Sequence, residues 1–170
     1  MPVVDHYFDV SNQALPIFSQ NRVMRLITSW YSKNPQRDKV RWSAILAVLA
    51  LGLQSQVPGD AASQNYTRNL EWLDYCMRNT QSVIPELINR DEDLLGIQVI
   101  LSLALLFRNS NDLRPSSTLL GMVVKLAHRM QLHSSDLAKY FDAEDSMQGS
   151  RVCWIIYTLD KVRLSRRQTR

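Results

Sequence analysis

The chain has 170 residues, of which 45% are hydrophobic and 21% charged, and this balance fits one globular domain with a substantial core. Its five glycines and six prolines exclude a collagen-like or low-complexity chain. The net charge is +4, but residues 1–160 hold 15 Lys and Arg against 16 Asp and Glu, so the positive excess comes from the last ten residues, KVRLSRRQTR. A nucleic-acid-binding domain spreads positive charge over a face, and the sequence predicts no such face.

Three features argue against secretion and against insertion into a membrane. The segment Met1–Val10 carries acids and no basic stretch, so we expect no signal peptide. Leu94–Phe107 is apolar but, at about 14 residues, shorter than the ~20 that a membrane span needs. Cys76 and Cys153 lack a CxxC spacing and are expected to be buried thiols, and the sequon at Asn65 is expected to remain unmodified.

In chain order, the first three predicted elements are helices of about residues 18–33, 40–54 and 61–83, because their apolar residues recur with a helical period. The second is apolar almost all round, and Asp60 can cap the third. On the first helix we expect four residues to face inward: Val23, Leu26, Ile27 and Trp30. On the third we expect five: Ala62, Tyr66, Leu70, Leu73 and Met77.

Three further helices are predicted, at about residues 92–107, 115–131 and 146–163. Asp91 can cap the fourth, which is the most apolar, and Pro115 suits the first turn of the fifth. The residues expected to face inward on the sixth are Val152, Ile155, Ile156, Leu159 and Val162. No alternating strand pattern is present, so we expect a single, irregular all-α domain of about six helices, with the second and fourth buried on most sides.

His128 and His133 are the first candidates for a functional site. They are five positions apart, and on a helix their side chains would diverge by about 140°, whereas two metal ligands on one helix face stand four apart. We therefore favour one histidine on a polar face and one near a helix C-terminus, where a cation complements the helix dipole. A zinc site that adds Cys76 and Cys153 is disfavoured, since structural zinc ligands come in closely spaced pairs. We expect no metal ligands in this chain.

Other ionisable clusters also have structural interpretations. The acids of residues 91–93 lie at a predicted helix start, where carboxylates cap free amides. Asp160 lies in an apolar helix, three residues before Arg163; either the two form a surface pair, or Asp160 ties this helix to a basic group elsewhere. The basic run at 161–170 is more typical of a solvated helix end than of a phosphate-binding or nuclear-localisation segment. No GxSxG, GxGxxG or GxxxxGK[ST] motif is present, and we expect no catalytic or cofactor-binding residues.

Two stretches of the chain resemble the fungal-specific transcription factor domain, the middle homology region downstream of the zinc binuclear cluster in fungal regulators: LLGIQVILSLALLFRNSNDLRPSSTLLGMVVKLAHRMQLH and RVCWIIYTLDKVRLS. The family shows a glutamine in an apolar helix, a helix ending in Gly-Leu-His, an Arg-rich step into Trp-Trp, then Leu-Asp-Arg and a Ser before Gly-Arg-Pro. The residues that match this structural motif are Gln98, His133, Arg151, Trp154, Asp160 and Ser165.

The chain departs from the family pattern at several positions. Gln131 replaces the glycine that ends the helix, Cys153 replaces a tryptophan and Lys161 an arginine. Arg170 comes where Gly-Arg-Pro would follow, so the resemblance implies that residues 1–170 form about the N-terminal two-thirds of the regulatory domain.

The resemblance implies a regulatory region of a fungal zinc-cluster transcription factor, located in the nucleus and without catalysis of its own. It implies zinc and specific DNA contacts only through an upstream cluster outside this chain, with a small-molecule effector, a co-regulator protein or a second copy as possible partners, and no membrane. The alternative from another class is a free-standing helical scaffold or adaptor whose surface includes the basic C-terminal run.

Overall fold

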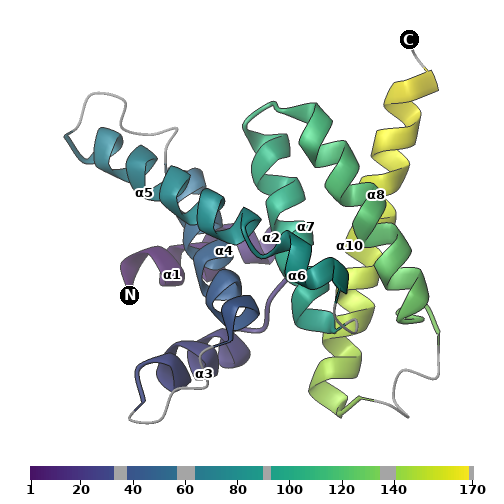
Figure 1. Ribbon diagram of the computed structural model, residues 1–170, viewed down its shortest axis with the longest axis horizontal. Coiled ribbons are helices and arrows are strands. Elements are labelled where there is room, and N and C mark those ends of the chain that lie inside the picture. The colour runs from purple at the N-terminus through teal and green to yellow at the C-terminus, as the bar shows by residue number, and fades with distance from the viewer. Residues whose placement is uncertain (33–37, 57–63, 90–92, 135–140, 169–170) are drawn as a thin grey trace. The chain divides into compact units, whose positions relative to one another are not determined.

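A computed structural model describes residues 1–32, 38–56, 64–89, 93–134 and 141–168, with side chains described except at 64–66 and 164–168. These ranges contain helices and no strand, which confirms the all-α prediction. Six of their helices have 11 residues or more, in agreement with the expected number: α3 (Gln20–Trp30), α4 (Lys39–Gln56), α5 (Gln64–Gln81), α7 (Leu94–Asn109), α8 (Leu113–Arg129) and α10 (Ala143–Gln168) (Figure 1). Within the same ranges, no helix has both the length and the apolar character needed to cross a bilayer.

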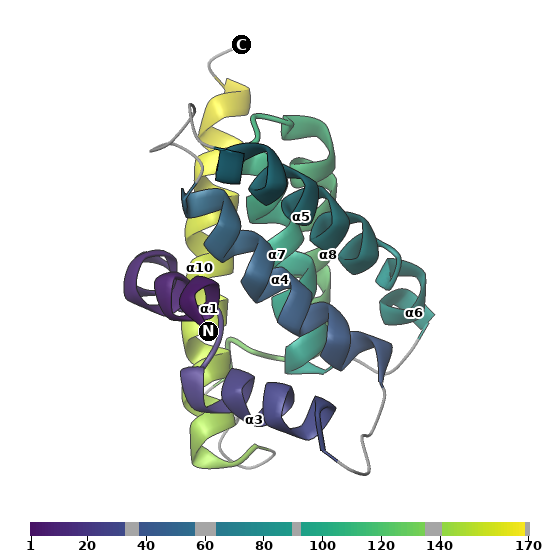
Figure 2. The ribbon, with the colours of Figure 1, turned by 90° about the vertical axis from the view of Figure 1, so that its left-hand side faces the viewer.

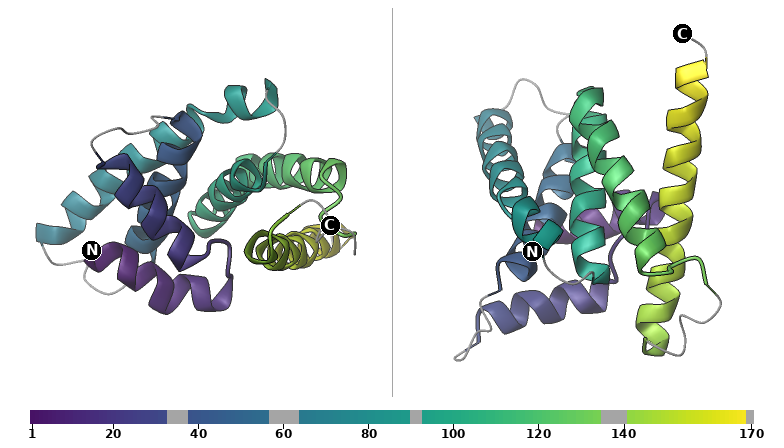
Figure 3. Two further views of the ribbon diagram at one scale, coloured as in Figure 1. Left: turned by 90° about the horizontal axis from the view of Figure 1, so that it is seen from below. Right: turned by 45° about the vertical axis from the view of Figure 1, so that its right-hand side comes forward.

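The helices group into two compact units, Met1–Arg90 and Asp91–Arg170. In the first unit, α4 contacts α3, α5 and the N-terminal helices α1 (Pro2–His6) and η1 (Tyr7–Ser11) (Figure 2). In the second unit, α7 and α8 pack as consecutive helices and α10 lies against both (Figure 3). That residues 1–170 behave as one domain stays a prediction.

Each unit contains one helix that is buried on most sides, as the sequence predicts for α4 and α7. Along α4, eleven residues between Val40 and Leu53 are buried, and along α7 twelve residues between Leu94 and Leu106. A helix without a polar face can be stable in water only when neighbours cover it all round. The helices in contact with them, α1, η1, α3 and α5 on α4 and α8 and α10 on α7, therefore contribute to this cover.

The N-terminal cover of α4 is a helical segment that the sequence pattern did not predict. Residues 2–14 form α1, the π-helical turn η1 and α2 (Asn12–Ala14), with Pro2 in the first turn, where its missing N–H costs nothing. Tyr7 is fully buried, and its hydroxyl donates to Asn12 Oδ1 at 2.9 Å. Burial raises the pKa of this phenol far above its ordinary value, so Tyr7 stays neutral and anchors the segment.

Gly52 permits the close approach of this segment to α4. A Cβ at position 52 would lie 2.5 Å from the carbonyl oxygen of Val3 and 2.9 Å from its Cγ1. Since the first of these atoms belongs to the backbone, only a movement of α1 could relieve the clash.

We predict that Gly52→Ala lowers the free energy of unfolding by up to about 2 kcal/mol, because the overpacking cost of ~1–3 kcal/mol outweighs the ~1 kcal/mol that alanine gains in a helix. Denaturant unfolding measures the total effect, and hydrogen exchange locates it. Amides of residues 2–14 should exchange faster in the variant, with those of α5 unchanged. A variant as stable as the parent, with unchanged exchange at 2–14, would contradict the assignment.

Two residues that were expected to be buried are exposed. Leu70 of α5 is 38% exposed, whereas Leu73 is buried as expected; among the described side chains of that helix Cys76 and Thr80 are buried too, and the expected Ala62 and the Tyr66 side chain lie outside the described residues. Val162 of α10 is 37% exposed, although Val152, Ile155, Ile156 and Leu159 are buried as expected. In both cases an apolar residue at the edge of a stripe turns outward, since a stripe wider than the covering surface cannot be buried completely.

The short helix α6 (Ile84–Asn89) was also not predicted.

Carboxylates begin three of the helices. The Asp93 side chain accepts the Gly96 N–H at 2.6 Å before α7, which confirms that the acids of residues 91–93 include a cap. Asp38 accepts the N–H of Val40 before α4, and Asp142 that of Asp145 before α10. The predicted caps at positions 60 and 91 lie outside the described residues.

The helix α8 ends in a Schellman turn at Gln131, the residue that replaces the family's glycine. Gln131 has a φ of 54°, and its N–H donates to the carbonyl of His128, while the Leu132 N–H donates to that of Ala127. Leu132 is buried, as the hydrophobic contact of this motif requires. The helix thus stops where the resemblance drawn from the sequence places a glycine, with a glutamine in a conformation that glycine adopts at lower cost.

We predict that Gln131→Gly stabilises the protein by about 0.5–1 kcal/mol, because glycine pays no Cβ penalty at a positive φ. Thermal or denaturant unfolding measures the change. The matched control is Gln81→Gly at the end of α5, a helical position without positive φ, where the same exchange should destabilise. Loss of stability in Gln131→Gly would show that the turn adopts another conformation.

Candidate functional site

The motif around Asp160 forms a junction between α10 and α8. Arg163 Nη2 lies 2.6 Å from Asp160 Oδ1, and Arg163 Nη1 donates to the Ser117 carbonyl of α8 at 3.1 Å. Both charged side chains are about three-quarters buried, so the pair is screened less than a surface pair. Asp160 therefore pairs with Arg163 on its own helix, as the first alternative drawn from the sequence expects, although the pair is largely buried and not at the surface. The connection to the neighbouring helix comes from Arg163 and ends on a backbone carbonyl, so the second alternative, in which Asp160 meets a basic group elsewhere, is wrong.

Gly121 provides the space for this guanidinium on α8. A Cβ at position 121 would lie 3.2 Å from Arg163 Nη1. A glycine inside a helix costs about 1 kcal/mol relative to alanine and so suggests a packing reason, but the sequence alone did not connect it with Arg163. A second contact of α8 was likewise missed: Ser116 Oγ donates a hydrogen bond to the Ala104 carbonyl of α7 at 2.8 Å.

The six motif residues are not brought together in one place. Gln98 is buried in α7 at 2% exposure, whereas His133 is exposed beyond the end of α8. Arg151 and Trp154 are both exposed, one turn apart on the outer face of α10. The backbone of residue 165 belongs to α10, and its side chain lies outside the described residues. The motif therefore marks separate structural positions along the second unit.

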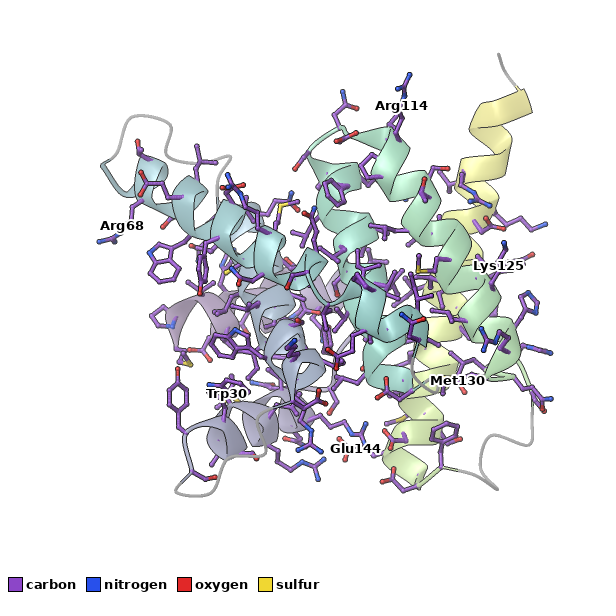
Figure 4. The ribbon with its side chains drawn as sticks, in the orientation of Figure 1. Trp30, Arg68, Arg114, Lys125, Met130 and Glu144 are labelled. Carbon is purple, nitrogen blue, oxygen red and sulfur yellow. The ribbon has the colours of Figure 1, made fainter. Side chains whose placement is uncertain are left out.

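The two histidines lie closer together than expected. Because α8 ends at Arg129 and the chain turns back at Gln131, the rings of His128 and His133 approach to 5.3 Å between centroids. The expected divergence is wrong, since it assumed a helix through both residues. Both rings are exposed, as are the neighbouring basic side chains of α8 such as Lys125, which points outward in Figure 4.

Metal-binding and thiol chemistry find little support in the described parts of the chain. There, no three His, Cys, Asp or Glu side chains gather closely enough to hold a metal ion. Cys76 is a buried free thiol, as expected, while Cys153 is free but only half-buried. Burial raises the pKa of Cys76 from 9.0 to about 11 and also raises the pKa of Cys153, so both thiols are poor nucleophiles at neutral pH.

The comparison with protein families identifies the class of protein. The model of the fungal specific transcription factor domain matches residues 4–164, and the chain belongs to this family. The match spans both compact units and confirms the resemblance drawn from the sequence. No solved structure is significantly similar to the chain.

The similar proteins are fungal transcription factors. The chain is 29% identical to the ABC-transporter-regulating transcription factors of Aspergillus fumigatus and Aspergillus oryzae, over 95% and 91% of its length respectively. It is 24% identical, over 94% of its length, to the Fusaridione A cluster transcription factor of Fusarium heterosporum. The chain spans only 18%, 17% and 30% of these three proteins.

We predict that Arg163→Met lowers the free energy of unfolding by about 1–3 kcal/mol, because it removes a charge-assisted hydrogen bond to α8 and leaves Asp160 without its cation. Arg151→Met, at an exposed arginine of the same helix, is the control and should stay within ~0.5 kcal/mol of the parent. The double variant Asp160→Asn/Arg163→Met should be less destabilised than the sum of the single variants. Equal stabilities of the Arg163 and Arg151 variants would disprove the junction.

We predict that the native protein loses stability above pH 9. The folded chain binds the Cys76 proton more tightly than the unfolded chain, so this contribution is complete below pH 9 and is lost as the pH rises toward 11. Denaturant unfolding between pH 8 and 11 measures the slope, which should decrease in Cys76→Ala compared with Cys153→Ala. A thiol reagent at pH 8 should label Cys153 before Cys76, and the reverse order would contradict this assignment.

Proposed function

We propose that this chain is part of the regulatory region of a fungal zinc-cluster transcription factor and acts in the nucleus. The observation that carries the proposal is the family match over residues 4–164, together with relatives that are themselves transcription regulators. In this role the chain controls transcription through contacts within the protein, or with an effector or partner. Zinc and specific DNA contacts would come from a cluster outside these 170 residues.

The placement of ionisable groups supports a non-catalytic role. Asp160 and Arg163 join two helices, and Asp93 caps a third. Regulation of this kind requires a helical domain with two arrangements that differ by only a few kcal/mol, so that a partner can bias one of them. The names of the Aspergillus relatives suggest genes for ABC transporters as targets, and we extend this to the present chain only as part of the proposal.

A free-standing adaptor is the alternative, since the exposed aromatic side chains of α10 suit a binding surface in either class of protein. Sequencing of the full transcript separates the two functions. The proposal requires an in-frame Cx2Cx6C cluster upstream of position 1. A transcript without such a cluster, whose product does not enter the nucleus, would favour the adaptor.

We further predict that in-frame removal of codons 4–164 from the gene changes the transcript levels of a defined gene set at least severalfold. RNA sequencing measures the change, and a strain with the exposed substitution Arg68→Ala is the control. Unchanged transcript levels in the deletion strain would contradict the regulatory function.

A further inference from the structure

The outer face of α10 carries an exposed aromatic pair. Trp154 is 69% exposed and Tyr157 55%, and their rings meet edge to face at 5.9 Å between centroids. Met147, also exposed, lies two turns before Trp154 on the same helix face. We name Met147, Arg151, Trp154, Tyr157 and Lys161 together the α10 outer face.

This face is not needed to hold α10 in place. The opposite side of the helix buries its apolar residues in the second unit, where α10 contacts α7 and α8. Arg163 adds its hydrogen bond to α8 from the same unit. A large exposed tryptophan adds nothing to the packing of α10 in the second unit, and exposed apolar patches with a polar rim mark interaction sites.

Cations flank the aromatic pair, and the acid that follows it, Asp160, is paired with Arg163 at 2.6 Å. Arg151 is exposed one turn before Trp154, and Lys161 Nζ lies 5.4 Å from the centre of the Tyr157 ring. Between Ser146 and Leu159 the sequence contains no Asp or Glu. The apolar centre of the face is therefore flanked by cations on both sides.

A similar aromatic pair on α5 lacks this charge pattern. Trp72 and Tyr75 also meet edge to face, at 5.7 Å, and both are exposed. Acids lie among them, since Glu71 and Asp74 are exposed on this helix and Asp74 is paired with Arg78 at 2.6 Å. The α5 pair thus provides an internal comparison with the same aromatic geometry and a mixed charge environment.

We propose that the α10 outer face is the docking site for an amphipathic helix of a partner protein, with apolar residues at its centre and Asp or Glu at its rim. Trp and Tyr are the side chains that anchor interfaces, and Arg and Lys beside them select an acidic partner through charge complementarity. A helix is the fitting occupant because α10 offers side chains and no unpaired backbone groups. The proposal rests on the regulatory function above, for which it names the contact surface.

The test uses the full 170-residue chain and two fluorescent 18-residue peptides. One carries Leu and Phe at positions i, i+3, i+4 and i+7 with Glu at the remaining positions; the other has Lys in place of every Glu. Fluorescence anisotropy should show that the acidic peptide binds at least tenfold more tightly, with affinity that falls as salt rises. Trp154→Ala should weaken this binding about tenfold or more, and the charge reversal Lys161→Glu severalfold.

Trp72→Ala on α5 is the matched control and should bind like the parent, while circular dichroism confirms that each variant remains folded. Equal binding of the acidic and basic peptides, equal losses from Trp72→Ala and Trp154→Ala, or no binding of the acidic peptide would each overturn the proposal. Concentration-dependent dimerisation abolished by Trp154→Ala would assign the face to a second copy and overturn it too. None of these outcomes changes the transcript test of the regulatory function, so the two can fail separately.

Discussion

The fold depends on the burial of two helices that have no polar face, α4 and α7. Each would expose a continuous apolar surface if it stood alone; α4 packs against α1, η1, α3 and α5, and α7 packs against α8 and α10. Polar contacts hold these neighbouring helices in place. Tyr7 and Asn12 secure the N-terminal segment that packs on α4, and Arg163 and Ser116 secure α10 and α8 in the second unit.

The sequence allows the long helices to be predicted because their apolar periodicity is strong. The identity of the two central helices follows from a different signal, the lack of a polar face, since a helix apolar all round has no surface for water. The stop of α8 near residue 131 was also foreseeable, although the pattern alone could not show that Gln131 would take the backbone conformation of the replaced glycine.

What the sequence could not give depends on long-range geometry. The N-terminal helices have no regular stripe, and the contact that explains them, Val3 against Gly52, joins positions 49 residues apart. The outward turn of Leu70 depends on how much of α5 its neighbour covers. For the candidate site, the Asp160–Arg163 pair was visible as an i, i+3 spacing, whereas the hydrogen bond to Ser117 required the packing of two helices.

Family membership and structure together describe a fungal specific transcription factor domain in which Asp93 caps one helix and the Asp160–Arg163 pair joins two others. The measurement that tests this account most directly is amide hydrogen exchange along the native chain. Because α4 and α7 form the two cores, their amides should exchange more slowly than those of every other helix in the same unit, with free energies of opening close to that of global unfolding. If α4 or α7 exchanged as fast as the helices that cover it, the account of this fold would be wrong.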